Sequence, residues 1–107
     1  MLKTKWWAEH SGGIDEIARA IYFYHEELDF EKIKDYALKM RNITIYKRLG
    51  YILDKTGLLD KYARTFQGIK LTKGYPRLDK IGPRKGVHNE KWKLFVNVDI
   101  SPKRWMY

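Results

Sequence analysis

The spacing of apolar residues changes at Gly68, and this change constrains the fold more than any other feature. Before Gly68, apolar residues recur at intervals of three and four, as in helices that bury one face. After it, a stretch rich in Gly and Pro leads to strict alternation over residues 92–100, the pattern of a strand. The sequence therefore predicts an α+β fold with about four helices followed by a small antiparallel β element at the C-terminus.

The first two helices are predicted over residues 14–28 and about 30–40. Acidic residues occupy the first turn of the first helix, and Asp29 is the expected N-cap of the second. Ser11-Gly12-Gly13 marks a turn before the first helix, and residues 2–8 fit either a helix or a strand. The second helix is expected to bury a stripe made of Phe30, Ile33, Tyr36, Ala37 and Met40.

The third helix is predicted over about 43–56, with Asn42 as its cap and Gly57 as the residue that ends it. Gly50 in its middle lowers helix propensity by about 1 kcal/mol relative to Ala, which indicates close approach of a neighbouring helix. A short fourth helix, about 58–66, is expected to bury Leu59, Tyr62, Ala63 and Phe66.

The strand over 92–100 is expected to place Trp92 in the core and to pair with a segment within 69–79. Ile69 and Leu71 resemble a short strand there. Residues 72–90 hold Gly and Pro at several positions and are predicted to be turns and loops. The basic, aromatic tail after Pro102 is expected either to pack back or to fray. The sequence contains no linker that would separate two domains, so residues 1–107 are predicted to form a single domain.

The net charge of +9 is distributed unevenly along the chain. Residues 1–28 carry three basic and five acidic side chains, residues 29–60 carry seven and five, and residues 61–107 carry twelve and three. This asymmetry favours a polyanionic partner, most often nucleic acid. The alternative is a charged surface adapted to solubility or heat, because abundant Lys, Ile and Tyr with a single Gln resemble a thermophile's composition.

The chain has no cysteine, so disulfides and Cys-based metal sites are excluded. The N-terminus lacks the apolar region of a signal peptide, and no apolar run approaches the roughly 20 residues of a membrane span. We therefore expect a cytoplasmic protein without a membrane partner.

Side chains suited to catalysis are scattered. His10, His25 and His88 are far apart and lack the i, i+4 spacing of a helical metal site, so His25 is expected to be a partly buried helix residue. Ser11-Gly12-Gly13 lacks the Lys and spacing of a phosphate-binding P-loop and fits a helix start better. No metal, no cofactor and no enzymatic activity are predicted.

Basic residues gather around the predicted loop and strand, with Tyr75 and Trp92 interleaved and Lys80 among them. Lys and Arg neutralise phosphates, whereas aromatic faces stack on exposed bases. The alternative interpretation is that these cations form an ordinary solvated surface without a binding role. The predicted nucleic-acid-binding residues, including a second cluster on the third helix, are Arg41, Lys47, Arg48, Lys70, Lys73, Arg77, Arg84, Lys85, Lys91 and Lys93.

The order of these segments resembles the C-terminal domain of AbiEi-type antitoxins, transcriptional regulators of type IV toxin–antitoxin systems. The resemblance covers about residues 11–97. Its more specific parts are Arg48-Leu49-Gly50-Tyr51 in the third helix and Trp92 with Asn97 in the strand. Further matching pieces are Ser11 to Ile17, Leu28-Asp29-Phe30, Tyr36-Ala37, Met40, Gly57, Leu78-Asp79, Gly86 and Asn89.

The resemblance implies a regulator that represses its own operon and opposes a nucleotidyltransferase-like toxin. In that family an N-terminal winged helix reads DNA, but only about ten residues precede Ser11, so we expect this chain to lack it. The resemblance then implies an effector role, with auxiliary phosphate contacts at positions such as Arg48 and Lys93.

The sequence therefore predicts an antitoxin-like regulatory domain whose basic surface contacts DNA phosphates. The alternative is a protein-interaction module that binds a toxin or a second copy of itself without nucleic acid. An RNA-processing or nucleotidyl-transfer enzyme is a third and weaker hypothesis.

Overall fold

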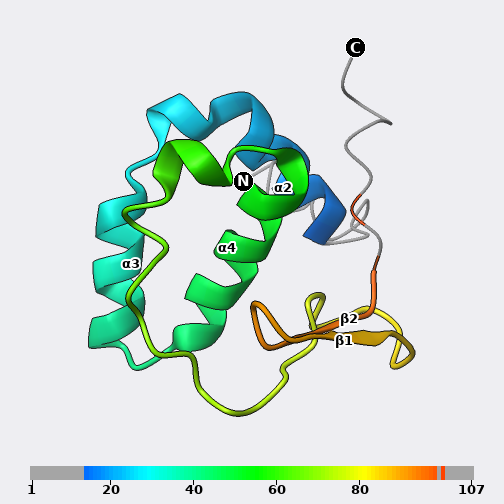
Figure 1. Cartoon of the computed structure of the whole chain (residues 1–107). Coiled ribbons are helices and arrows are strands. Elements are labelled where there is room, and N and C mark those ends of the chain that lie inside the picture. The colour runs from blue at the N-terminus through cyan, green and yellow to red at the C-terminus, as the bar shows by residue number, and fades with distance from the viewer. Residues whose placement is uncertain (1–13, 99, 101–107) are drawn as a thin grey trace.

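The computed structural model describes residues 14–98 and residue 100. These residues form three α-helices, two short 3-10 helices and a two-stranded antiparallel sheet. Figure 1 shows the helices gathered above and beside the sheet, which lies at the lower end of the molecule. The predicted α+β class is confirmed, with three α-helices instead of about four.

The first predicted helix is divided into two elements, α2 (Ile14–Tyr24) and the 3-10 helix η1 (His25–Glu27). The chain becomes extended at Leu28, so the helix does not reach the predicted end. His25 is partly buried, as expected, and its Nδ1 lies 2.7 Å from the Tyr62 hydroxyl.

Helix α3 (Phe30–Lys39) begins where the sequence predicts. The Asp29 carboxylate accepts a hydrogen bond from the Lys32 backbone N–H at 3.1 Å, which confirms the N-cap. The predicted apolar stripe was too wide, because Tyr36 is 57% exposed and Met40 60% exposed. Helix α3 instead contacts the core through Phe30 and Ala37, and the fully buried Ala37 has room for only a small side chain.

Helix α4 (Ile43–Thr56) is the central element and contacts α2, α3 and the 3-10 helix η2 (Leu59–Tyr62). Asn42 occupies the N-cap position without a side-chain hydrogen bond, and Gly57 ends the helix with a left-handed φ of 80°. The residues that α4 buries are Tyr46, Lys47, Gly50, Tyr51, Ile52, Leu53 and Thr56.

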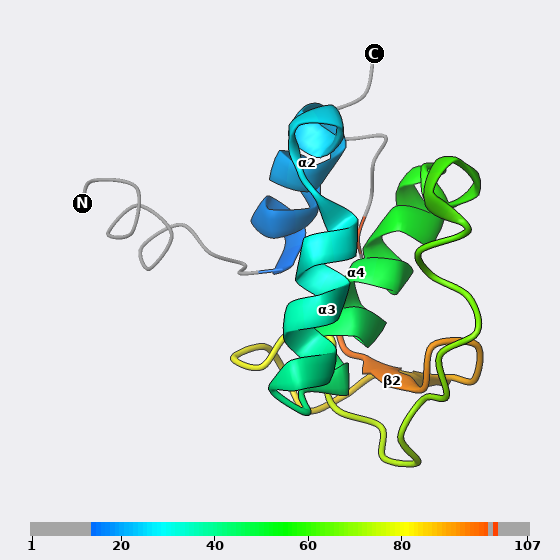
Figure 2. The same ribbon diagram turned by 90° about the vertical axis from the view of Figure 1, so that its left-hand side faces the viewer.

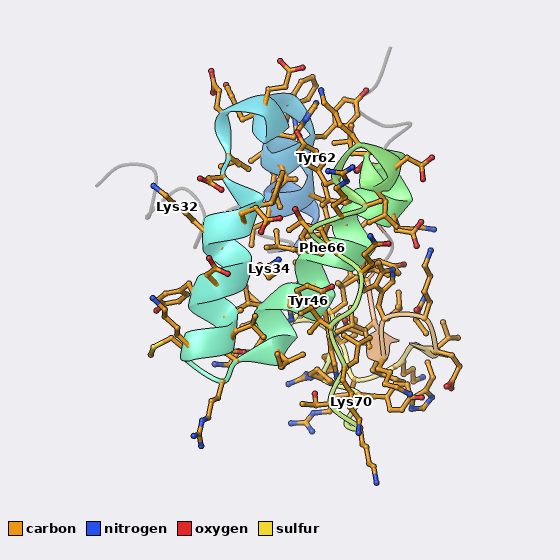
Figure 3. All side chains as sticks on the ribbon, turned by 60° about the vertical axis from the view of Figure 1, so that its left-hand side comes forward. Lys32, Lys34, Tyr46, Tyr62, Phe66 and Lys70 are labelled. Atoms are coloured by element: carbon orange, nitrogen blue, oxygen red, sulfur yellow. The ribbon has the colours of Figure 1, made fainter. Side chains whose placement is uncertain are left out.

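The fourth predicted helix was wrong, because only η2 forms and the chain then turns through residues 63–66. Ala63 is exposed, whereas Phe66 is buried. Phe66 lies 5.1 Å from Tyr46, 6.0 Å from Phe30 and 6.5 Å from Trp92, measured between ring centroids. The packing of the Phe66 ring in this aromatic row, and not helical periodicity, determines the path of residues 63–66. Figure 3 shows Tyr62, Phe66 and Tyr46 following one another down this row.

The sheet consists of β1 (Val87–Asn89) and β2 (Leu94–Val96), with His88 opposite Phe95. The predicted strand over 92–100 is therefore shorter, and its antiparallel partner does not lie within 69–79. A single parallel bridge from Arg77 to Phe95 is the only pairing from that region in the described chain. The strand shortens because Trp92 belongs to a turn, in which its N–H donates to the Asn89 side-chain oxygen at 2.9 Å.

Trp92 is in the core, as predicted, and is 4% exposed. Its indole packs against Gly50, where an added Cβ would overlap the ring. The close neighbour of Gly50 is therefore a side chain from the hairpin turn and not a helix. The Trp92 indole N–H donates to the Asp54 carboxylate at 3.1 Å, one helical turn after Gly50 on the same face of α4, which joins the hairpin to this face.

Three predictions lie outside the described residues: the element at residues 2–8, the turn at 11–13 and the tail after Pro102. Within the described ranges, no helix is long and apolar enough to cross a membrane.

Candidate nucleic-acid interface

The basic residues of the segment 69–93 lie at one end of the molecule. Figures 1 and 2, which differ by a rotation about the vertical axis, both show residues 69–86 and the β1–β2 hairpin at the lower end, away from η2. Residues 69–93 contain eight basic and two acidic side chains. The fold therefore keeps together the cations that the sequence places close together.

Lys47 does not belong to the exposed part of this region. Its side chain is 0% exposed, and its amine donates to the carbonyl oxygens of Thr72 at 3.0 Å and Gly74 at 2.7 Å. The sequence places Lys47 in the second basic cluster on the third helix, but in the structure the loop over 72–74 covers it. Lys47 cannot contact a phosphate while the loop is in place, and it anchors the loop instead.

Arg48 anchors the next part of the same segment. Its Nε and Nη2 donate to the carbonyl oxygen of Arg77 at 3.1 and 2.7 Å. Arg77 in turn donates from Nη1 to the Gly82 carbonyl oxygen at 3.2 Å. Both arginines are partly buried, so most of their hydrogen bonding holds backbone in place.

Burial changes the protonation of these anchors. It lowers the pKa of the Lys47 amine, and the nearby positive charge of Lys93 lowers that pKa further. Burial also lowers the pKa of the Arg48 guanidinium, although the Asp79 carboxylate acts in the opposite direction. Both effects follow from removing a cation from water.

Asn97 is a further anchor, and sequence analysis did not assign it a role. It is buried, its side-chain oxygen accepts from the Asp79 N–H at 2.9 Å, and its Nδ2 donates to the carbonyl oxygens of Asp79 at 2.9 Å and Pro83 at 2.7 Å. Its sequence signals were a polar residue within the alternating run and its place in the family resemblance, and neither predicts these hydrogen bonds. Asn97 fixes the loop that carries Lys80, Arg84 and Lys85.

Lys91 and Lys93 occupy the hairpin turn. Lys91 is exposed, but its amine lies 3.1 Å from the Asp54 carboxylate, so part of its charge is already balanced. Lys93 adopts a left-handed φ of 50°, and its amine lies 5.8 Å from the Tyr75 ring centroid. Lys93 is partly exposed and has no acidic partner among the described residues.

The remaining predicted residues are exposed. Arg41 follows the end of α3 and has φ 54°. Figure 3 shows Lys70 pointing away from the helices. We define the basic surface as the cations of the loops and hairpin that retain exposure and have neither an acidic partner nor a side-chain hydrogen bond to backbone in the described chain: Lys70, Lys73, Lys80, Arg84, Lys85 and Lys93.

A different set of residues surrounds η1 and η2, at the opposite end. Residues 25–31 contain four acidic and no Lys or Arg side chains, and η2 adds Asp60 and Lys61. A groove of about 400 Å³ there is lined by Glu26, Glu27, Asp29 and Glu31, among other residues. Within the described chain, no three His, Cys, Asp or Glu side chains converge in a way that would hold a metal ion.

Comparison of the chain with protein-family models, curated proteins and solved structures finds no match.

Proposed function

We propose that this chain is an antitoxin-like transcriptional regulatory domain that binds DNA through the phosphate backbone. The observation that carries the proposal is the basic surface, which gathers six cations at one end of the molecule. The two acidic side chains of residues 69–93, Asp79 and Glu90, leave a clear excess of positive charge there, because the same segment holds eight basic side chains.

Binding of this kind needs no base-specific contact. Cations that neutralise phosphates release condensed counterions, so the affinity is set by the number of cations engaged and falls with salt. The anchors Lys47, Arg48 and Asn97 support the proposal, because loops held by buried hydrogen bonds lose less conformational entropy on binding.

The regulatory part of the proposal depends on the resemblance to AbiEi-type antitoxins. It implies that a neighbouring gene encodes a nucleotidyltransferase-like toxin. Expression of that toxin should arrest growth, and co-expression of this chain should relieve the arrest. Continued arrest with abundant folded chain would contradict the antitoxin role and leave DNA binding to be judged separately.

The DNA-binding part is tested by measuring the affinity for duplex DNA at several salt concentrations. We expect a dissociation constant of about 10⁻⁴ to 10⁻⁶ M near physiological salt, with log affinity falling linearly with log salt. Reversing Arg84→Glu and Lys85→Glu together should weaken binding and reduce the salt slope by about 2.

The matched control reverses Lys32→Glu and Lys39→Glu on α3. Both residues are exposed, and the pair changes the net charge by the same amount outside the basic surface. It should leave most of the affinity intact. Equal losses in the two pairs, or binding independent of salt, would exclude a specific role for the basic surface.

A second candidate function is a protein-interaction module, and an apolar groove favours it. The groove has a volume of about 320 Å³ between α2, α3 and α4, and Ile17 at its edge is 43% exposed. We assign it an acidic toxin as partner, because two copies of a chain with net charge +9 repel each other. The residues that line it are Ile14, Ile17, Ile21, Leu28, Ile33, Ile45, Arg48, Leu49 and Ile52.

The variant Ile17→Glu distinguishes the two candidate functions, DNA binding and toxin binding. If the groove binds the toxin, this variant should abolish co-purification with the toxin at high salt and leave DNA affinity unchanged. Tyr36→Glu, on the exposed side of α3, is the control. A homodimer detected by sedimentation, lost in Ile17→Glu, would instead assign the groove to a second copy.

A further inference from the structure

Three aromatic rings meet on the outer side of the hairpin. The His88 ring lies edge-on to Tyr75, with centroids 4.9 Å apart and planes at 86°, and to Phe95, with centroids 5.2 Å apart and planes at 66°. His88 is exposed, and Tyr75 and Phe95 are partly exposed. We call these three residues the aromatic platform.

The strand register places the platform away from the core. His88 and Phe95 are direct partners in the antiparallel pair, so their side chains lie on the same face of the sheet. The neighbouring Leu94 is 0% exposed and faces the opposite side, toward the core. The core of the molecule therefore does not depend on the platform for its burial.

The platform is held in a fixed position. The Phe95 N–H donates to the Pro76 carbonyl oxygen at 2.9 Å, which ties Tyr75's neighbour to the sheet. The Tyr75 hydroxyl donates to Glu90 at 2.6 Å, and this hydrogen bond raises the pKa of Tyr75 above its usual range. Tyr75 therefore stays neutral, and its ring orientation is set.

The basic surface surrounds the platform. Lys93 approaches the Tyr75 ring, and the chain segments that contain Tyr75 and His88 also carry Lys73 and Lys85 two or three residues away. Aromatic faces beside cations are how proteins bind single strands, because every base has a stacking face and every nucleotide has a phosphate. In a duplex the base faces are already stacked on one another and cannot reach such a ring.

We propose that the aromatic platform binds unpaired nucleotides, stacking one or two bases on Tyr75, His88 and Phe95 while the basic surface holds the flanking phosphates. The proposal rests on the proposed function, because it uses the same basic surface. It adds that the preferred ligand is single-stranded nucleic acid.

The test compares three ligands of about twelve nucleotides: a single strand, the duplex of the same sequence, and an abasic strand of equal charge. The wild-type chain should bind the single strand about five- to tenfold more tightly than the abasic strand, as expected for stacking of one base. DNA and RNA versions of the single strand identify which nucleic acid is preferred.

Variants locate the effect. His88→Thr and Phe95→Thr, singly and together, keep residues that favour strands and remove the rings. They should lower affinity for the single strand to that of the abasic strand and leave abasic and duplex binding unchanged. Tyr36→Thr, which removes an exposed ring from α3, should change none of the three affinities.

The outcomes separate this proposal from the general one. Equal binding of the single and abasic strands by the wild-type chain would overturn the platform and leave phosphate binding intact. No binding to any of the three ligands would overturn the proposed function itself. If the hairpin variants unfold, the wild-type comparison of single and abasic strands still decides the question.

Discussion

At the scale of single residues, several side chains have structural roles or backbone conformations that are unusual for their residue type. Lys47 is a buried donor and Arg48 a partly buried donor to backbone oxygens, and Asn97 is buried although the alternating run places it on the polar side. Arg41 and Lys93 adopt left-handed backbone conformations that usually belong to glycine. Each of these features leads to a measurable consequence of substitution.

Gly50→Ala should destabilise the chain, although Ala favours a helix by about 1 kcal/mol. The added methyl group would overlap the Trp92 ring, and overpacking of this kind costs about 1–3 kcal/mol. Urea unfolding measures the change. Gly74→Ala, where an added Cβ meets open space, is the control, and the two should differ clearly. A more stable Gly50→Ala chain would mean that Trp92 does not pack there.

Arg41→Gly should stabilise the chain by about 0.5–1 kcal/mol. After α3, the Asn42 N–H donates to the Ala37 carbonyl oxygen at 2.8 Å, and Arg41 takes the left-handed position of this helix ending. Gly57 takes the same position after α4, with an N–H···O bond of 2.9 Å from Leu58 to Leu53.

The reverse change, Gly57→Ala, should therefore cost about 1 kcal/mol. Thermal unfolding of both variants checks the pair, because one melting temperature should rise and the other should fall. Changes of the same sign would contradict the equivalence of the two helix endings.

At the scale of elements, helix α4 organises the candidate site. From its consecutive residues Lys47 and Arg48 it holds two parts of the following loop, and through Gly50 and Asp54 it holds the hairpin turn. The basic surface is therefore a set of loops fixed to one helix. Substitutions in α4 should therefore destabilise the basic surface more than substitutions in the loops themselves.

Lys47→Met tests this at alkaline pH. Burial lowers the pKa of Lys47 in the folded chain below its usual 10.5, so near that value the unfolded chain binds more protons. Stability from this group therefore rises as pH increases toward 10.5, whereas the cost of charging Lys47 is fully present at lower pH. The unfolding free energy of the wild-type chain, measured relative to Lys47→Met, should increase as the pH rises toward 10.5. A difference independent of pH would mean that the amine is solvated.

The elements also show how far the sequence predicts this fold. Periodicity located α3 and α4, and Asp29 and Gly57 marked a beginning and an end, because caps act through neighbouring backbone. Periodicity failed where contacts between residues distant in sequence determine the path of the chain. Phe66 leaves a helical path to reach Tyr46, and β2 is shortened by a turn that depends on Asn89 and Trp92.

The candidate site was predictable to a similar extent. Charge clustering identified the region, and six of its cations retain exposure with neither an acidic partner nor a side-chain hydrogen bond to backbone in the described chain. Sequence reasoning could not separate Lys47 from Lys70, because burial depends on which loop covers a helix face. It also missed that His88 meets Phe95, since this contact follows from the register of a hairpin whose first strand has only three residues.

At the scale of the whole molecule, charge is separated between two ends. The acidic residues around η1 and η2 lie at the end opposite the basic surface, in a molecule with extents of 35 × 33 × 29 Å. A polyanion should therefore approach by one end only, because the screening length near 0.1 M salt is about 10 Å.

Glu27→Lys with Asp60→Lys tests whether position or net charge controls binding. The pair raises the net charge by four at the acidic end, and both residues are exposed. Duplex affinity near 0.1 M salt should rise by less than about threefold, because the new charges lie beyond the screening length of the bound phosphates. A tenfold or larger gain would indicate that net charge alone drives association.

The concealed amine of Lys47 also gives the chain an internal reporter. A reagent that acylates primary amines should modify the exposed lysines quickly and Lys47 only when the loop over 72–74 lifts, since both carbonyl oxygens and the surrounding chain must move first. Among the described lysines it is the only buried one, so its acylation rate, read by mass spectrometry, measures loop opening directly. If a bound nucleic acid holds the loop closed, that rate should fall on binding.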